Sequence, residues 1–434
     1  MDLELPAEPL DLGPPRRVFA RRFVSPIRSA PNPDGERLGY LRAGALLHST
    51  TSEPLGFEGC EGGWYELDTG GYVCQGRDVL VFSGERLPEL RARQPDRDAQ
   101  MPYEYVTVRR TTPLYKRLPK ADELYTGPSE TPDARAGAPQ EQSTQPEVID
   151  NPLVLRVLRP GFYVSLDRTF DKDGETYWRT QQNGFVPARR TRQKESSTFE
   201  GQVLDGQRWD LPMAVTQTER TTVYRVNDRG RLRASRASFD RRSWLAVQSR
   251  RRIGDVAYVA VGNGALVRES DVLLIQPAAP PEQVGHGQRW IDVDLTHQVL
   301  VAYEWKRPRY VTLVSTGRTR TPSPELDYRT PKGVHRIRGK HLTSTMDNDE
   351  PGEPPYSLED VPYVMYFRGA YAFHSAFWHD SFGRPRSHGC INLAPLDAKW
   401  LYNWAGPDLP GIWHGGAATE DNPGTWVYVH GDTP

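Results

Sequence analysis

The chain has 434 residues, and its 55 lysines and arginines nearly balance its 56 aspartates and glutamates, giving a formal net charge of −1. This balance excludes the overall positive field typical of nucleic-acid-binding proteins. No run of about 18 apolar residues is present that could span a membrane. The 38 glycines and 38 prolines predict short strands joined by frequent turns, and the length predicts about three domains at ~150 residues each.

The first thirty residues lack the apolar stretch of a secretory signal peptide, so we expect either a cytosolic protein or one whose export signal is absent from this sequence. The pattern of the three cysteines indicates whether the protein belongs to a reducing or an oxidising compartment. Cys60 and Cys74 flank the segment EGGWYELDTGGYV, a predicted hairpin that could bring them together. A disulfide closing a loop of this size would add ~3 kcal/mol, but the spacing leaves open whether the bond forms. Cys390 is the third cysteine and is left over from this pair, so it is either a buried residue without a chemical role or a reactive thiol.

A weak internal repeat organises the first two thirds of the chain. Segments 59–82, 173–191 and 253–275 each contain an alternating strand, a glycine turn and a Gly-apolar-Val strand, a pattern typical of strands with one buried face. The repeat predicts small β modules. The second module contains a polar, proline-rich insert that we expect to be mobile. We expect an amino-terminal tail at 1–20, module 1 at 21–95, module 2 at 104–195 with its insert at 126–152, and module 3 at 196–276.

These modules resemble the SH3-like modules often attached to bacterial cell-wall enzymes, although a single irregular all-β region is the alternative. Module 3 is rich in arginine, with ten arginines against two acidic residues between Arg225 and Arg252. Such a surface could bind anionic wall polymers. An ordinary solvated surface would explain the same composition.

A proline-rich linker at 277–288 precedes a carboxy-terminal domain at 289–434. Alternating strands are predicted within 290–317, at 330–337, within 361–378 and at 425–430. A polar loop is expected at 341–358. Residues 393–405 predict a short helix that ends at a Gly-Pro pair. The fold class expected is therefore mainly β, with small barrels followed by a β-rich domain that has one or two short helices.

The chemistry concentrates in the segment HSAFWHDSFGRPRSHGCINL, residues 374–393. A thiol nucleophile needs a base or cation to stabilise the thiolate, and a strand-loop-strand return could bring His374 to Cys390. His388 could face the same side, whereas His379 is expected to be a polar loop residue. These histidines and the thiol could also bind a metal, but no CxxC or HExxH pattern accompanies them, so no metal is expected.

The segment SHGCIN (387–392), with HSAFWH (374–379) upstream, resembles the signature of YkuD-type L,D-transpeptidases. The resemblance extends over about 290–430 and includes strand patterns at 291–304 and TPKGVHRI at 330–337. It implies a β-rich sandwich or barrel with one or two helices. It also implies an enzyme that needs no cofactor.

The resemblance assigns roles to the residues of the signature. Cys390 is the expected nucleophile and His374 the base, oriented by the backbone carbonyl of Ser375. The backbone N–H groups of His388, Gly389 and Cys390 would form an oxyanion hole.

Substrate contacts follow from the same resemblance. Tyr356 and Trp378 would form walls for the peptide, and Arg384 and Arg386 could pair with substrate carboxylates, although solvated loop arginines are the alternative. The full set of expected substrate-binding residues is Tyr356, Trp378, Arg384, Arg386, Ser387 and Asn392.

The implied reaction is peptidoglycan cross-linking. The thiolate would attack the L-centre carbonyl of the third residue of a tetrapeptide stem, release D-Ala and form a thioester. An amine of a second stem would resolve it into a 3–3 cross-link. Water would make the enzyme an L,D-carboxypeptidase, and a protein amine would anchor that protein to the wall. Carbapenems should acylate the same thiol.

This chemistry implies a periplasmic or cell-envelope protein whose export signal is absent from the sequence, and it favours the Cys60–Cys74 disulfide. Three alternatives are weaker. A papain-like endopeptidase would place its cysteine before its histidine, whereas only His414 and His430 follow Cys390. A non-catalytic wall-binding scaffold would not need an intact signature. A redox sensor would need a resolving cysteine near Cys390.

Overall fold

The computed structural model describes residues 15–84, 93–125, 151–321, 326–348 and 355–434. The described part of the protein is mainly β, as expected, with 45% of its residues in strands. In the described ranges the one α-helix is α1, Pro395–Trp404, close to the predicted 393–405. No helix in this part of the chain is long and apolar enough to cross a membrane.

The chain divides into two compact units whose boundaries cut across the predicted domains. Unit 1 comprises Met1–Ser196, Gly339–Val364 and Pro407–Asn422, and unit 2 comprises Ser197–Arg338, Met365–Gly406 and Pro423–Pro434. Two segments of the predicted carboxy-terminal domain therefore cluster with modules 1 and 2. Most of the insert in module 2 lies outside the described residues.

Module 1 in unit 1 has its own core, in which Val18, Ile27, Leu41 and Val73 are fully shielded from solvent. Alternating burial along Ser25–Arg28 reflects the period-two pattern of a strand with one buried face. The strands are β1 (Arg17–Ala20), β2 (Ser25–Arg28), β3 (Arg37–Leu41), β4 (Leu46–His48), β5 (Trp64–Glu66), β6 (Tyr72–Cys74) and β7 (Val79–Phe82).

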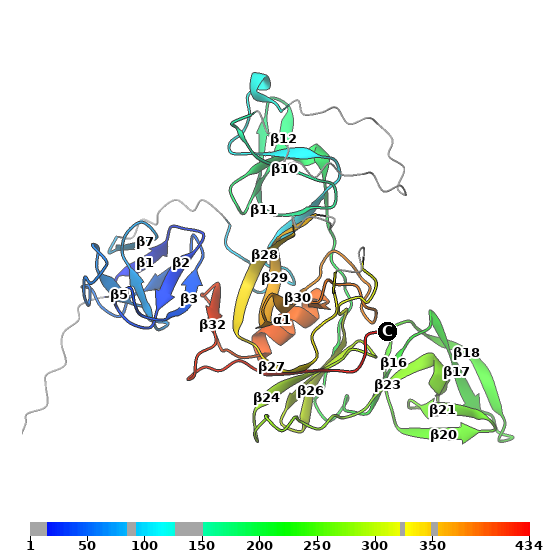
Figure 1. Ribbon diagram of the computed structural model, residues 1–434. Helices are drawn as coiled ribbons and strands as arrows, with labels where there is room; N and C mark the ends of the chain where they lie inside the picture. The colour runs from blue at the N-terminus through cyan, green and yellow to red at the C-terminus, as the bar shows by residue number, and fades with distance from the viewer. Residues whose placement is uncertain (1–14, 85–92, 126–150, 322–325, 349–354) are drawn as a thin grey trace, which may run out of the picture. The chain divides into compact units, whose positions relative to one another are not determined.

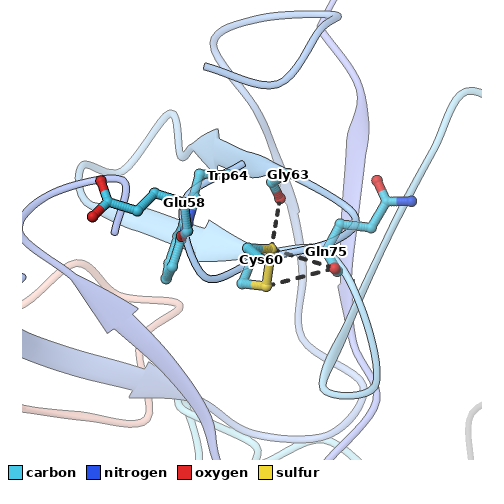
Figure 2. The surroundings of a disulfide bond; sticks show 6 residues. Glu58, Cys60, Gly63, Trp64 and Gln75 are labelled. Atoms are coloured by element: carbon cyan, nitrogen blue, oxygen red, sulfur yellow. Dashed lines mark hydrogen bonds between the residues drawn. A yellow bond between two sulfur atoms is a disulfide. The ribbon is translucent and has the colours of Figure 1, made fainter. Parts of the chain in front are cut away.

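The disulfide that the sequence left open is formed between Cys60 and Cys74, with Cα atoms 5.8 Å apart. Figure 2 shows it beside Trp64 and Gln75. Trp64 pairs with Cys74 across the β5–β6 hairpin, and its indole N–H donates to the carbonyl of Glu58 at 2.7 Å. The bond therefore joins the β6 end of the hairpin to the loop that leads into β5.

Module 2, also in unit 1, is built around Val106, Leu158, Val164 and Val186, all fully buried. Its longest strand, β11, pairs with β8 and β12. The strands are β8 (Glu104–Val108), β9 (Thr112–Tyr115), β10 (Val154–Leu158), β11 (Tyr163–Lys172), β12 (Glu175–Thr180), β13 (Phe185–Pro187) and β14 (Thr191–Gln193).

The polar loop predicted at 341–358 is wrong over 341–348 and 356–358, and residues 349–354 lie outside the described residues. Strand β28 covers Gly339–Asn348, and β29 runs from Tyr356 to Arg368. The two are hydrogen-bonded neighbours in one sheet, and β28 also pairs with β32, Gly415–Ala417. The pattern misled because buried positions in these strands are polar, including Thr343, Glu359 and Asp360.

Asp360 explains why this strand can bury polar side chains. Its carboxylate accepts both terminal nitrogens of Arg42 from module 1, at 2.6 and 3.1 Å. It also accepts the hydroxyls of Ser165 at 2.6 Å and Thr343 at 2.9 Å. Its backbone carbonyl accepts the hydroxyl of Tyr105 at 2.6 Å. Module 1, module 2 and the β28–β29 pair thus meet at one buried carboxylate.

Unit 2 contains a six-stranded sheet in the order β15-β26-β25-β24-β33-β27. Its central strands bury Trp290, Ile291, Leu300 and Val311 completely. The bounds are β24 (Arg289–Asp294), β25 (Val299–Glu304), β26 (Arg307–Leu313), β27 (Gly333–Arg336) and β33 (Trp426–His430). These strands agree with the alternation predicted at 290–317, 330–337 and 425–430 (Figure 1).

Module 3 belongs to unit 2, which begins at Ser197, and its strand β15, Gln202–Val203, pairs with β26. Met213 and Ile275 share one apolar cluster with Val301 of the six-stranded sheet. The remaining strands are β16 (Met213–Thr216), β17 (Arg220–Val226), β18 (Leu232–Asp240), β19 (Trp244–Ala246), β20 (Ser249–Ile253), β21 (Val256–Ala260), β22 (Leu266–Arg268) and β23 (Val272–Ile275).

Candidate active site

The expected nucleophile and base lie on two neighbouring parallel strands. β30 covers Tyr371–Ser375 and β31 covers Ile391–Leu393, with His374 opposite Asn392. This register extends to put Cys390 opposite Ala372, two positions before His374 and therefore on the same face. Strand spacings of ~4.8 Å and ~3.3 Å per residue place the two Cα atoms about 8 Å apart, within reach of a thiol and an imidazole that lean together.

The Cys390 side chain lies just before β31 and is partly exposed. Its sulfur is 3.8 Å from the backbone carbonyl of Ala370. Burial raises the pKa of the thiol to about 11, and a backbone hydrogen bond from Ala372 opposes part of this rise. The resting cysteine is therefore protonated at neutral pH, and it needs a base to become nucleophilic.

His374 has the position and tautomer of such a base. Its ring is buried, and its Nδ1 donates to the carbonyl of Ser375 at 3.1 Å. Because a carbonyl only accepts, the proton lies on Nδ1 and Nε2 keeps its lone pair. Trp378 stacks on the ring with centroids 5.7 Å apart. Burial lowers the pKa of His374 to about 4, so the imidazole is neutral at rest.

The turn before Cys390 requires glycine. Gly389 has φ +118°, and a Cβ there would come within 2.4 Å of the Tyr371 ring. The Gly389 N–H donates to the hydroxyl of Ser387 at 3.0 Å, and that hydroxyl donates to the carbonyl of Cys390. The three-donor oxyanion hole expected from sequence is thus not preformed, because Ser387 already takes one donor. The N–H groups of His388 and Cys390 are the remaining candidates.

A threonine that sequence reasoning did not single out braces this turn. The Thr330 hydroxyl donates to the carbonyl of Gly389 at 2.8 Å and accepts the N–H of Gly317 at 2.9 Å. Gly317 in turn bridges to Ser387. The motif TPKG, which begins at Thr330, predicts the start of a strand. The motif alone does not indicate that the Thr330 hydroxyl also supports the turn before Cys390.

The imidazole of His388 accepts a hydrogen bond from an arginine that the sequence pattern also did not indicate. Arg318 donates from Nη2 to Nε2 of His388 at 3.0 Å, and Tyr328 packs edge-on against the imidazole with centroids 4.4 Å apart. Because arginine has no acceptor, Nε2 must carry a lone pair. His388 then carries its proton on Nδ1, and its Nε2 lone pair is engaged by Arg318.

His379 lies in the loop before the signature, as expected from sequence, but its side chain is not solvated. It is buried, its Nδ1 accepts the N–H of Ser381 at 3.1 Å, and its Nε2 lies 3.1 Å from the Asn392 amide. Since Nδ1 accepts, Nε2 carries the proton and should meet the amide oxygen, which has no partner in the present orientation. Asn392 is thus buried against His379 in β31, and its contact with a substrate stays a prediction.

The other expected substrate residues divide into two groups. Arg384 and Arg386 are exposed in the loop before the signature, as a role in carboxylate binding would require. Tyr356 begins β29 in unit 1, whereas Cys390 lies in unit 2, so its role stays a prediction. Within the described residues, no group of three His, Cys, Asp or Glu side chains could hold a metal ion.

The comparisons with known proteins agree with this chemistry. Residues 288–429 match the family model of the YkuD L,D-transpeptidase catalytic domain, and this segment is such a domain. The match covers β24 to β27 and most of β33 in the six-stranded sheet, together with β30, β31 and α1, but not β15. No curated protein matches the chain.

Solved structures similar to the chain are L,D-transpeptidases. One from Stackebrandtia nassauensis is 27% identical and has a TM-score of 0.25, with 35% of this chain and 60% of that chain covered. The catalytic domain of the E. faecium enzyme is 25% identical, covers 34% of this chain and 100% of its own, and has a TM-score of 0.25. L,D-transpeptidase 3 from Mycobacterium tuberculosis, with a faropenem-derived adduct, is 21% identical over 41% of this chain and 68% of its own, with a TM-score of 0.26.

Proposed function

We propose that the protein is a cysteine-dependent peptidoglycan L,D-transpeptidase. The observation that supports the proposal is the parallel pairing of β30 with β31, because its register, extended by one residue, would bring Cys390 and a neutral His374 to one face within a YkuD domain. The Cys390 thiolate attacks the L-centre carbonyl of the third residue of a tetrapeptide stem. D-Ala leaves, and a thioester links the stem to the enzyme until an amine of a second stem forms the 3–3 cross-link.

The protonation states support one order of proton transfers. The thiol begins neutral and so does His374, whose Nε2 lone pair accepts the thiol proton as sulfur attacks. The same proton then passes to the departing D-Ala amine. Burial keeps both groups uncharged before substrate binds, which protects the thiol from unproductive reactions.

Location and partners follow from this substrate. Peptidoglycan lies outside the cytoplasmic membrane, which favours a periplasmic or envelope protein, and the Cys60–Cys74 disulfide suits that oxidising compartment. The exposed arginines of module 3 on β18 and β20 offer a surface for anionic wall polymers. Water or a protein amine remains a possible acceptor in place of a second stem.

The test is intact-mass spectrometry after incubation with a carbapenem, with peptide mapping of the adduct. A β-lactam-derived adduct is present in the M. tuberculosis enzyme named above. We expect one adduct on Cys390, none in C390A, and slow formation in H374A. Failure of folded wild-type protein to react would contradict the proposal and favour a wall-binding scaffold. Tetrapeptide stems with and without an acceptor amine would then separate cross-linking from hydrolysis.

A further inference from the structure

The loop between the two reactive residues is fastened to module 3. This loop runs from Ala376 to Gly389, and Asp380 lies near its middle. Arg242, in the turn after β18, donates from Nη1 to one carboxylate oxygen of Asp380 at 2.9 Å and from Nη2 to the other. The Ser197 hydroxyl donates to the same carboxylate. These bonds lower the pKa of Asp380, the bond from Arg242 being the largest cause.

An aromatic stack lies beside this ion pair. The Arg242 guanidinium lies over the ring of Phe199, 5.0 Å from its centroid. Phe199 stacks in turn on Phe382 of the loop, with centroids 6.0 Å apart, and on Trp244 of β19. Phe382 is completely buried. Module 3 therefore contacts the loop through a bidentate charge pair and an apolar stack, which together fix both its position and its orientation.

The fastened residues connect directly to the reactive strands. His379, next to Asp380, contacts the Asn392 side chain, and the carbonyl of Ser381 accepts the Ser315 hydroxyl at 3.0 Å. Ser315 and Asn392 exchange both backbone hydrogen bonds, each 2.9 Å long. Asn392 is paired with His374 and stands two residues after Cys390. Each step from Arg242 to the reactive pair is thus a contact between neighbouring residues.

We propose that module 3 is a positioning platform for the active site, and that Arg242 and Asp380 are positioning residues that set the geometry of Cys390 and His374. This inference rests on the proposed function of those two residues. The role differs from that of a separate wall-binding module, because module 3 also shares its apolar core with the catalytic sheet.

The exposure of the ion pair indicates that its main effect is on position. The Arg242 and Asp380 side chains are 19% and 51% exposed, and pairs this open contribute little to stability. Positioning is more demanding, since a misplacement of ~1 Å at a reacting group can lower a rate about 100-fold. The pair should therefore affect reactivity more than unfolding.

The experiment measures the reactivity of Cys390 in the full-length protein. R242A and D380A are compared with R117A, which breaks an exposed bidentate arginine–glutamate pair, Arg117–Glu123, inside module 2. The readouts are the rate of carbapenem acylation and the pH profile of Cys390 alkylation by iodoacetamide. We expect acylation about tenfold slower in R242A and D380A, a shifted alkylation profile, and no change in R117A.

The charge-reversed double variant R242D/D380R should recover part of the lost rate. Should R242A fold poorly, R242Q is the second variant, because its stem still covers Phe199 while the bidentate pair is lost. Acylation and alkylation at wild-type rates in R242A or R242Q would overturn the inference. If Cys390 of the wild-type protein is alkylated but does not react with a carbapenem, the proposed transpeptidase activity is contradicted. The alkylation profiles of the variants would still test whether module 3 positions the active site.

Discussion

Two arginine–aspartate pairs tie the amino-terminal modules to segments of the carboxy-terminal region, and they differ in nearly every physical respect. In unit 1, the Arg42 and Asp360 side chains are 6% and 1% exposed, and other hydrogen bonds complete the carboxylate. In unit 2, Arg242 and Asp380 are partly solvated. The same residue types thus form a buried structural junction in one unit and an adjustable surface contact in the other.

The difference lies in what removal of one partner leaves behind. An arginine left in a buried site has no water to replace its carboxylate, whereas an arginine at the surface is rehydrated at once. The Arg42–Asp360 pair should therefore control folding of unit 1. The Arg242–Asp380 pair should control geometry in unit 2. Four measurements test or sharpen this contrast.

The largest effect is expected from D360A. The substitution leaves Arg42 buried without a counter-charge and removes the acceptor of Ser165 and Thr343. Loss of one partner of a buried pair costs about 3–5 kcal/mol. Urea unfolding followed by tryptophan fluorescence measures it, with R117A as the exposed-pair control. A loss below about 1 kcal/mol would show that the junction is more hydrated than its burial indicates.

Module 1 also has a covalent connection that can be removed without altering charge. C60S/C74S should lower its free energy of unfolding by about 3 kcal/mol, since the reduced loop regains chain entropy. Wild-type protein in reductant should unfold at the same urea concentration as the variant. A reductant-dependent shift in the variant itself would point to a different source of stability.

Asp397 is a further buried carboxyl, hydrogen-bonded to neutral groups rather than paired with an arginine as Asp360 is. It accepts the Tyr310 hydroxyl and the Gly201 N–H, each at 2.7 Å, and burial raises its pKa to about 7. A folded pKa above the unfolded ~3.8 means that folding retains a proton, so stability falls as pH rises through this interval. We expect a loss of about 2 kcal/mol between pH 5 and pH 7, absent in D397N. Identical pH profiles of the two proteins would place the carboxyl in contact with water.

The smallest effect on stability is expected from R242A. Because its pair with Asp380 is half-exposed, the free energy of unfolding should fall by less than about 1 kcal/mol. Urea unfolding in parallel with D360A measures the contrast directly. Equal losses in both variants would abolish the distinction between a structural and a positioning pair.

Much of this organisation could be predicted from the sequence. The alternation at 290–317, the helix ending before Gly406 and the reactive segment around Cys390 all follow from local pattern. Local pattern failed at 341–358, because β28 and β29 bury polar residues against polar partners from modules 1 and 2. Hydrophobic periodicity cannot detect a strand whose buried face is hydrogen-bonded rather than apolar.

Within the site, short-range motifs located Cys390 and His374 but not their supports. Arg318 and Thr330 come from the segment between β26 and β27, far away in sequence, and only the fold brings them to the SHGC turn. His379 was misjudged for a similar reason, since its partner Asn392 lies across the loop. Sequence proximity therefore identified the reacting groups, and tertiary contacts assigned the tautomers.

The buried junction at Asp360 has a consequence for how this protein can be divided. Strand β29 begins among modules 1 and 2 and ends in the unit that holds Cys390. A fragment limited to the carboxy-terminal domain would leave Asp360 and Glu359, both almost fully buried here, facing solvent without their arginines. The catalytic domain is thus poorly suited to transfer into another protein on its own. A chimaeric protein that preserves function should contain the modules together with it.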